Sequence, residues 1–281
     1  KNRRVVCAAG QTVTDCGSPG EIMNKPMRCL DLFSGIGGFS LGLERAGMET
    51  VAFCEYDKKC RKVLQKHWPE VPQFNDVRTL TGEQLERRGI TTDLICAGMP
   101  CQPYSRGNWL RKGRGDIRDM SGEAIRLVRE IEPAIFIGEN TEGFLDIGYD
   151  AFADDLENEG YSCEAISIPS CAVGLPTLER HVWIIASTSG KRLQRYVEKT
   201  MENIEALSWK LQRGDTGVGG RWDLSRPRVH RSGERVSGRM DRNKQLGNAV
   251  DPVVIEQIGR AIIEVENESS TEKKRKFEAK K

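Results

Sequence analysis

Short apolar runs alternate with segments of helical period along most of the chain, and this alternation limits the fold more than any other feature. The apolar runs carry the β-branched and aromatic residues expected of buried strands. They are RCLDLF (28–33), TVAFCE (50–55), TDLICA (92–97) and AIFIGE (134–139). Helix-like segments lie between them, such as FSLGLERAG (39–47), which a glycine ends. Strands that alternate with helices predict an α/β fold, a doubly wound and mostly parallel sheet with helices on both faces.

The alternation stops near Ser187, and the segment that follows is basic and rich in glycine. From Lys191 to Lys244 the chain has fourteen lysines and arginines against seven acidic residues, although the whole chain carries only +2. A basic segment on a near-neutral body is typical of phosphate contacts, and a solvated arginine-rich loop is the plainer alternative. After it, QLGNAVDPVVIEQIGRAIIEV (245–265) returns to a helical period.

These changes of pattern divide the chain into two domains and two terminal segments. We expect residues 27–187 and the returning helix at 245–266 to form one large domain. The basic segment, 188–244, is expected to form a small separate module. Residues 1–26 are interpreted as a loose N-terminal extension, and residues 267–281 as a disordered charged tail.

The composition disfavours membrane, secreted and metal-binding proteins. No apolar run approaches the roughly 20 residues that span a bilayer, and no apolar signal core stands near the N-terminus. The nine cysteines form no C-x-x-C pair, and the three histidines lie far apart in the sequence. We therefore expect a reduced protein inside the cell, with no metal and no membrane contact.

The segment DLFSGIGGFS (31–40) follows the first strand and opens a helix, which is where α/β sheets bind nucleotides. Its glycines let the backbone approach a ligand closely. However, Ser40 stands where a dinucleotide fingerprint has glycine or alanine, and no basic residue accompanies the loop. A nucleoside without phosphates fits better, with Glu55 accepting hydrogen bonds from ribose hydroxyls and Asp76 from an adenine amino group. A glycine-rich turn that packs a helix against its strand is the alternative.

Four motifs in a fixed order give the chain a family resemblance. They are DLFSGIGGFSLGL (31–43), GMPCQPYS (98–105), GEN (138–140) and QLGNAV (245–250). Together they resemble the DNA (cytosine-5)-methyltransferase family, of phage, prophage or bacterial type, over most of the chain from Met27 to about Val265. The resemblance implies the Rossmann-like fold of S-adenosylmethionine-dependent methyltransferases, with 188–244 as a small target-recognition domain.

The resemblance also implies which residues hold the cofactor, S-adenosyl-L-methionine. Phe33 would pack on it, the glycine loop would surround it, and Asn248 would reach its methionine end. The residues implied are Phe33, Ser34, Gly35, Ile36, Gly37, Gly38, Glu55, Tyr56, Asp76, Val77, Pro100, Asn248, Ala249 and Val250.

For the reaction, the resemblance implies that Cys101 is the nucleophile, adding as a thiolate to carbon 6 of a flipped-out cytosine. The ring then attacks the methyl group through carbon 5. Glu139 would neutralise the charge that builds at ring nitrogen 3. The basic residues of SRGNWLRKGRGDIRD (105–119) are expected to favour the thiolate, and this segment to close over the base. An ordinary surface loop is the alternative for this segment.

The chain departs from the family's Gln-x-Arg-x-Arg pattern. In GLPTLERHVWII (174–185), Thr177, Glu179 and His181 stand at those three positions, and Arg180 lies one position away. Either Arg180 or His181 is expected to contact the base carbonyl or stabilise the loop, and Arg180 is taken as the third catalytic candidate. The residues expected to contact DNA are Gln102, Ser105, Arg106, Arg226, Arg228, Arg231, Arg239 and Arg242.

These motifs predict a DNA (cytosine-5)-methyltransferase, with three alternatives. One is an RNA cytosine-5 methyltransferase of the same fold, and another is a catalytically silent DNA-binding relative, which the altered pattern at 177–181 favours. A nicotinamide-dependent oxidoreductase is disfavoured by Ser40 in the loop. The expected partners are double-stranded DNA and, for a restriction–modification enzyme, a cognate restriction endonuclease. We expect a monomer in the cytoplasm of a bacterial or phage-infected cell.

Overall fold

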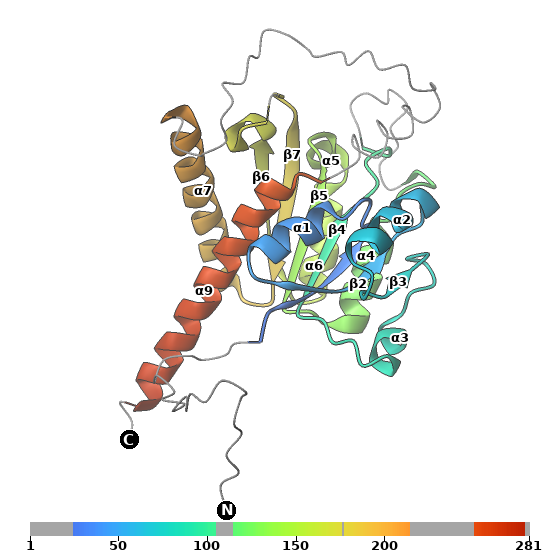
Figure 1. Cartoon of the computed structure of the whole chain (residues 1–281), viewed down its shortest axis with the longest axis horizontal. Coiled ribbons are helices and arrows are strands. Elements are labelled where there is room, and N and C mark those ends of the chain that lie inside the picture. The colour runs from blue at the N-terminus through green and yellow to red at the C-terminus, as the bar shows by residue number, and fades with distance from the viewer. Residues whose placement is uncertain (1–24, 105–114, 176, 214–249, 279–281) are drawn as a thin grey trace, which may run out of the picture.

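The computed structural model describes residues 25–104, 115–175, 177–213 and 250–278 (Figure 1). Within these residues, strands form one sheet in the order β3-β2-β1-β4-β5-β7-β6. The first five of these are parallel, whereas β7 runs antiparallel to both of its neighbours. The predicted mostly parallel α/β sheet is therefore confirmed. The strands are β1 (Arg28–Leu32), β2 (Glu49–Cys54), β3 (Gln73–Phe74), β4 (Leu94–Gly98), β5 (Ile135–Thr141), β6 (Ser162–Pro169) and β7 (Arg180–Ser187).

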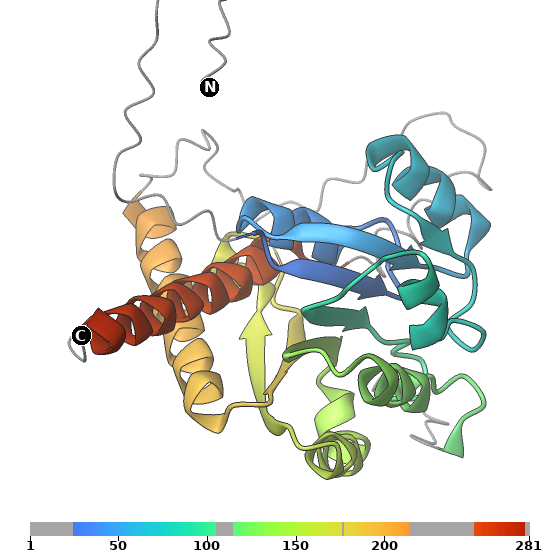
Figure 2. The ribbon, with the colours of Figure 1, turned by 90° about the horizontal axis from the view of Figure 1, so that it is seen from below.

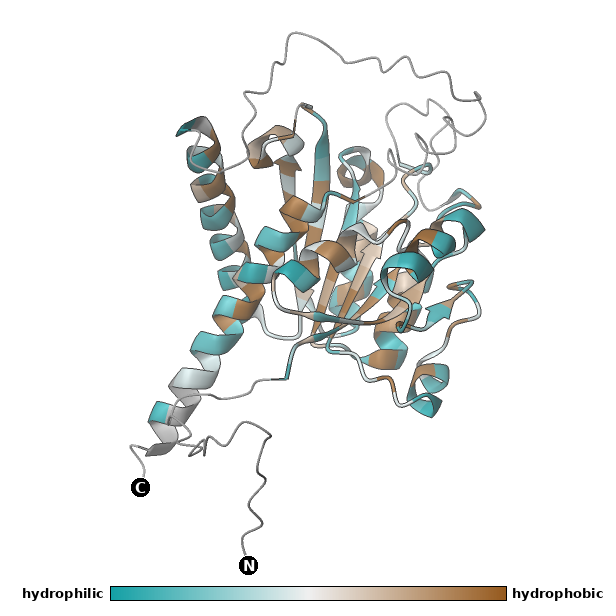
Figure 3. Ribbon diagram, viewed as in Figure 1, coloured by the Kyte–Doolittle hydropathy of each residue, from teal (hydrophilic) through white to brown (hydrophobic). Residues whose placement is uncertain are grey.

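Helices cover both faces of this sheet (Figure 2). Buried side chains of α1, α7 and α9 share one core with one face of the strands, and α3, α4, α5 and α6 share another core with the opposite face. The apolar colouring of the central strands in Figure 3 follows from burial on both sides. The helices are α1 (Gly38–Arg45), α2 (Lys58–His67), α3 (Gly82–Arg87), α4 (Ser121–Ile131), α5 (Gly143–Ile147), α6 (Tyr149–Asn158), η2 (Ser170–Val173), α7 (Gly190–Arg213) and α9 (Pro252–Glu278).

The strand order creates a crevice between β1 and β4. From β1 the chain moves outward through β2 to β3, and it then returns to β4 on the other side of β1. The segments that leave the carboxyl ends of β1 and β4 therefore diverge, and such a switch point is the usual ligand site of an open α/β sheet. None of the described helices is both long enough and apolar enough to cross a membrane.

Helix α7 differs from the sequence expectation, which placed it in the separate basic module. Its side chains Leu193, Tyr196 and Ile204 are buried in the core that also contains Trp183 of β7. Its basic side chains reach acidic ones: Arg192 contacts Glu266, Arg195 contacts Glu268, and Lys199 contacts Glu202 and Glu264. The apolar face thus places residues 190–213 in the large domain, and ion pairs offset the positive charge of Arg192, Arg195 and Lys199.

The predicted disordered tail is also corrected, because α9 continues to Glu278. Two hydroxyls in this stretch donate within the helix, Ser270 Oγ to the carbonyl of Glu266 and Thr271 Oγ1 to the carbonyl of Asn267. Arg195 of α7 pairs with Glu268. The helix therefore extends past residue 266 for two reasons. Arg195 of α7 contacts it, and the stretch is rich in glutamate and lysine, which are good helix formers. Residues 279–281, 1–24 and 214–249 lie outside the described part of the chain.

The glycines of α1 let α9 approach closely. A Cβ atom on Gly42 would lie 1.9 Å from Cγ2 of Ile255 and 2.5 Å from the carbonyl oxygen of Pro252, and one on Gly38 would lie 2.3 Å from the carbonyl oxygen of Val250. The backbone of α1 therefore touches the start of α9 directly. This contact explains why an apolar helix returns at the end of the sequence.

We expect Gly42→Ala to lower the free energy of unfolding by about 1–3 kcal/mol, because the methyl group overpacks this contact. Gly122→Ala in α4 is the matched control, since nothing lies within 4 Å of its Cβ position. That variant should be neutral or stabilising by up to about 1 kcal/mol. Urea unfolding followed by circular dichroism measures both, and equal stability of the two variants would contradict the close approach.

Candidate active site

The glycine loop turns sharply after β1. Phe33 has φ 54°, which is unusual for a residue with a side chain, while Gly35 has φ 54° and Gly37 has φ 91°. The Gly37 amide donates to the carbonyl of Ser34 at 2.8 Å. A Cβ on Gly37 would lie 2.6 Å from the Trp68 ring, whereas nothing lies within 4 Å of the same position on Gly35. The loop is therefore packed on one side and open at Gly35.

Glu55, which follows β2, holds the open part of the loop. Its Oε2 accepts a hydrogen bond from the Gly35 amide at 2.7 Å, and its Oε1 accepts one from the Asp57 amide at 2.6 Å. A carboxylate oxygen can accept more than one hydrogen bond. Glu55 is therefore fixed at the end of β2, as the sequence predicted for a residue that binds ribose. Its carboxylate oxygens can still accept further hydrogen bonds.

Asp76 lies after β3 and is paired with Arg78, a residue that the sequence reasoning missed. Arg78 donates from Nε to Oδ1 of Asp76 at 2.9 Å and from Nη2 to Oδ2 at 2.5 Å. These hydrogen bonds lower the pKa of the Asp76 carboxyl. The Arg78 guanidinium also lies 5.8 Å from the ring centre of the exposed Tyr56. Tyr56, Asp76 and Arg78 thus gather at one end of the site, and the neighbouring Val77 is buried.

A buried carboxylate, Asp31, lies beneath the loop and was not expected from the sequence. The Ser40 hydroxyl donates to its Oδ2 at 2.7 Å, and its Oδ1 has no hydrogen-bond partner among the described residues. Burial raises the pKa of Asp31 to about 7, against the opposing effect of Ser40. Ser40, which replaces the third glycine of a dinucleotide fingerprint, therefore has a structural role as the donor to Asp31.

Cys101 follows β4 in a tight turn. The Tyr104 amide donates to the Cys101 carbonyl at 2.9 Å. The buried Tyr104 ring packs edge-on against Phe144, with centroids 4.7 Å apart. This aromatic contact anchors the turn, while Cys101 itself stays partly exposed.

The environment of the Cys101 thiol differs from the expected one. Burial raises its pKa, and the carboxylates of Glu139 and Glu179 raise it further. The surroundings of Cys101 that the structure describes therefore favour the neutral thiol over the thiolate. Most of the basic residues expected to favour the thiolate, from Arg106 to Arg114, lie outside the described part. Arg118 is described, but its guanidinium pairs with Asp116 and is not among the groups that act on the thiol.

Glu139 and His181 lie together where β5 and β7 pair. Glu139 is opposite Trp183 and Thr141 is opposite His181, so these four side chains share one face of the sheet. His181 Nδ1 lies 3.1 Å from Glu139 Oε1. The geometry is not that of an aligned hydrogen bond, since Nδ1 has no hydrogen-bond partner, so the contact is an ion pair when His181 is protonated. Arg180 is exposed and precedes His181 in the strand, so its side chain leaves from the other face. The structure therefore brings His181 to Glu139 and leaves Arg180 apart.

Ile36 is partly buried within the glycine loop. The other site residues expected from the sequence fall into two groups. Val250 lies against the loop and β4, because a Cβ on Gly98 would lie 3.2 Å from Cγ2 of Val250. Pro100 is partly buried and Gln102 is exposed beside Cys101. The rest lie outside the described residues: Asn248, Ala249, Ser105, Arg106, Arg226, Arg228, Arg231, Arg239 and Arg242.

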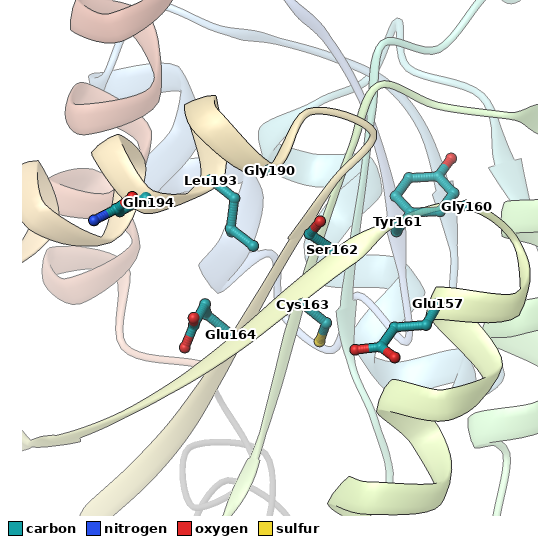
Figure 4. A pocket seen from close by; sticks show the side chains of 9 residues that line it. All are labelled: Glu157, Gly160, Tyr161, Ser162, Cys163, Glu164, Gly190, Leu193 and Gln194. Atoms are coloured by element: carbon teal, nitrogen blue, oxygen red, sulfur yellow. The ribbon is translucent and has the colours of Figure 1, made fainter.

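A separate cavity of about 680 Å³ opens between the end of α6, the start of β6 and the start of α7 (Figure 4). Ser162, one of its lining residues, pairs with Ser187 at the opposite end of β7 from His181. The cavity therefore lies at the edge of the sheet away from Cys101, and it takes no part in this site. Within the described residues no cluster of His, Cys, Asp and Glu has the arrangement of a metal site.

Comparison with known families agrees with this geometry. The model of the C-5 cytosine-specific DNA methylase family matches residues 27–218. The chain belongs to this family. The family and the fold together imply the use of S-adenosyl-L-methionine.

Two curated relatives are named type II methyltransferases. M.HgiCII of Herpetosiphon aurantiacus is 33% identical over 168 residues, which are 57% of this chain and 37% of the relative. M.FnuDI of Fusobacterium nucleatum is 38% identical over 120 residues, 42% of this chain and 33% of the relative. The chain thus spans little more than a third of the length of these relatives.

A solved structure supports the fold alone. The methyltransferase EhMeth of Entamoeba histolytica matches with a TM-score of 0.50 and 20% identity, over 59% of this chain and 54% of that chain.

The residues of the loop fit a nucleoside cofactor. Gly35 leaves open space beside a backbone amide, Glu55 is fixed next to it, and Asp31 has one buried oxygen without a hydrogen-bond partner among the described residues. Asp31 is fully buried, so the groups open to a ligand are Gly35 and Glu55. The Glu55 carboxylate can accept further hydrogen bonds from ribose hydroxyls, so S-adenosyl-L-methionine suits this donor and acceptor set.

The raised pKa of Asp31 predicts a pH dependence of stability. The folded state binds more protons than the unfolded state between the ordinary value of 3.8 and about 7, so the stabilising contribution is complete below 3.8 and is lost as the pH rises through 7. Asp31→Asn cannot titrate. Between about pH 5 and about pH 8 the wild type should therefore lose about 2 kcal/mol more of its free energy of unfolding than the variant.

Urea unfolding at the two pH values measures this difference. Asp154→Asn, at an exposed position of α6, is the matched control and should keep the wild-type pH dependence. Identical pH dependence in wild type and Asp31→Asn would show that Asp31 does not titrate as stated.

Proposed function

We propose that this chain is the catalytic part of a DNA (cytosine-5)-methyltransferase, which methylates carbon 5 of a flipped-out cytosine in a specific duplex DNA sequence. The observation that carries the proposal is the meeting of Cys101 and Glu139 at the ends of adjacent strands. Gly98 of β4 pairs with Glu139 of β5, and Cys101 follows Gly98 by three residues. The glycine loop after β1 lies on the other side of the β1–β4 crevice. The proposed nucleophile Cys101, the proposed acid Glu139 and the glycine loop thus lie at the same edge of the sheet.

The chemistry follows from these residues. Carbon 5 of cytosine is a weak nucleophile, and addition of the Cys101 thiolate to carbon 6 gives an enamine-like ring that is a stronger one. Glu139 stabilises the charge that this addition places on ring nitrogen 3. Bound S-adenosyl-L-methionine supplies an electrophilic methyl group on a sulfonium. Loss of the carbon 5 proton to solvent and expulsion of Cys101 then restore the aromatic ring.

The carboxylates near Cys101 make formation of the thiolate the demanding part of this proposal. Glu139 and Glu179 both raise the pKa of the thiol, so positive charge has to offset them. His181 is the cationic candidate among the described residues near Glu139. The arginines of 105–114 are further candidates by sequence.

Recognition of DNA is assigned to the segment between α7 and α9. We propose that residues 214–249, with Arg226, Arg228, Arg231, Arg239 and Arg242, form the target-recognition module, and that Gln102, Ser105 and Arg106 contact the flipped nucleotide. Both ends of this segment meet the large domain, since α7 and α9 pack against each other. A cognate restriction endonuclease, a monomeric state and action in the cytoplasm of a bacterial or phage-infected cell complete the proposal.

A catalytically silent DNA-binding relative is the competing function. The observation that favours it is Glu179, an acidic residue that lies near Cys101 where the family's pattern has arginine. Incubation of the full chain with methyl-labelled S-adenosyl-L-methionine and plasmid DNA free of C5 methylation separates the two, since only an enzyme labels the DNA. A parallel reaction with transfer RNA tests the RNA-methylating alternative. Label in RNA alone, or in neither nucleic acid, would overturn the proposal, and bisulfite sequencing of labelled DNA gives the target.

Cys101→Ser is expected to lower methyl transfer by about a thousandfold or more, because a serine hydroxyl is far less acidic and less nucleophilic than a thiol. DNA binding should remain largely intact. Cys171→Ser is the matched control, because Cys171 is an exposed free cysteine in η2. Its activity should equal that of the wild type.

The covalent step has its own measurement. Duplex DNA with 5-fluorocytosine at the mapped target should trap the wild type and Cys171→Ser as adducts that resist denaturation, and should not trap Cys101→Ser. A normal rate of methyl transfer by Cys101→Ser would remove Cys101 from the role of nucleophile.

A further inference from the structure

His181 lies among three carboxylates that come from different parts of the fold. Glu139 Oε1 on β5 is 3.1 Å from its Nδ1, and Glu179 Oε1, just before β7, is 3.7 Å from its Nε2. Asp251, at the start of α9, is 8% exposed and close enough for the charge of His181 to lower its pKa, which burial raises. Two carboxylates therefore lie within 4 Å of the imidazole, and a third, from another element, is near enough to feel its charge.

This arrangement favours the imidazolium form. The pKa of His181 is raised chiefly by its pairing with Glu139, and Glu179 adds to the effect, while burial opposes it. The side chain is 19% exposed and that of Glu139 is 13% exposed, so water screens the contact only in part. The cation gains two acidic neighbours, and Glu139 gains a fixed partner.

The same carboxylates act on Cys101. Glu139 and Glu179 raise the pKa of the thiol. If His181 were neutral, the described groups that act on the Cys101 thiol would include acidic ones and no cation. An imidazolium offsets one of those charges and restrains the Glu139 carboxylate beside Cys101.

We propose that His181, as an imidazolium, is the positioning residue for Glu139 and takes the place of an arginine in the family's pattern. The inference rests on the proposed methyl transfer. It differs from the sequence expectation in choosing His181 over Arg180, and in giving the residue an action through Glu139. Unlike arginine, histidine titrates near neutral pH, so this substitution adds a pH dependence to the reaction.

The sign of that dependence follows from the two charged forms that the reaction needs. At low pH, kcat/KM rises with pH because the thiolate of Cys101 becomes more populated. Above the pKa of His181, loss of the imidazolium cancels the further gain of thiolate, and kcat/KM levels off. In His181→Arg the positive charge remains at every pH, so kcat/KM should continue to rise toward the pKa of the thiol.

The kinetic test compares the wild type, His181→Arg and His181→Gln from about pH 5.5 to about pH 9, with unmethylated plasmid DNA and labelled S-adenosyl-L-methionine. His181→Gln should lower kcat/KM by about ten- to a hundredfold near neutral pH, the effect of losing an interaction with a charged group. His181→Arg should retain most of the activity, and its kcat/KM should keep rising with pH where that of the wild type levels off. His67→Gln, an exposed residue at the end of α2, is the control and should keep the wild-type profile.

A second measurement does not depend on activity. The chain has three histidines, His67, His181 and His230, so His181→Gln assigns the His181 imidazole resonance in an NMR titration. The pKa of His181 should lie above its ordinary value of 6.5 and should fall in Glu139→Gln. It should fall less in Glu179→Gln, since that side chain is 66% exposed and farther away.

The outcomes separate this inference from the proposed function. Absence of methyl transfer by the wild type overturns the function, and the NMR titration still decides whether the pair forms. A wild-type rate and pH profile in His181→Gln, or a His181 pKa that Glu139→Gln leaves unchanged, overturns the positioning role. Failure of His181→Arg to restore activity while His181→Gln is impaired also counts against it.

Discussion

The direct contact between α1 and α9 joins the two ends of the large domain, and the candidate site depends on it. Gly38 and Gly42 lack the side chains that would hold the helices apart, so the backbone of α1 meets Val250, Pro252 and Ile255. Because Gly38 also ends the cofactor loop, the same contact places the start of α9 beside that loop and beside β4. The start of α9 therefore lies at the active-site edge of the sheet, and the last turns of α7 lie beside Gly174, where a Cβ atom would be 3.0 Å from Leu211.

Several acidic groups gather at this edge of the sheet. Asp31 and Asp251 are buried carboxylates with raised pKa values, and Glu139 and Glu179 act on Cys101. A site with this much buried acid favours bound cations and donors. The sulfonium of the proposed cofactor and the proposed His181 imidazolium would both meet that need, at the glycine loop and beside Cys101 respectively.

The distribution of positive charge shows why a segment's net charge can mislead. Residues 191–244 carry a net positive charge, yet Arg192, Arg195 and Lys199 of α7 pair with glutamates of α9 and so join the two helices. The buried Leu193, Tyr196 and Ile204 lie on the same helix, so its apolar period was the better guide to its place. The net charge of a segment indicates a binding partner only when the charges that form ion pairs within the fold are left out of the sum.

The sequence by itself determined the α/β class, the mostly parallel sheet, the return of the last helix and the positions of the glycine loop, Glu55, Cys101 and Glu139 at strand ends. These depend on local periods and on short motifs, which neighbouring residues encode. Only the tertiary structure decided that Asp31 is buried beneath Ser40, that Arg78 pairs with Asp76, that α7 belongs to the core and that α9 runs to Glu278. It also decided that His181, and not Arg180, meets Glu139. The physical reason is that each of these depends on strand register, on burial or on a partner distant in sequence, and a linear pattern specifies none of the three.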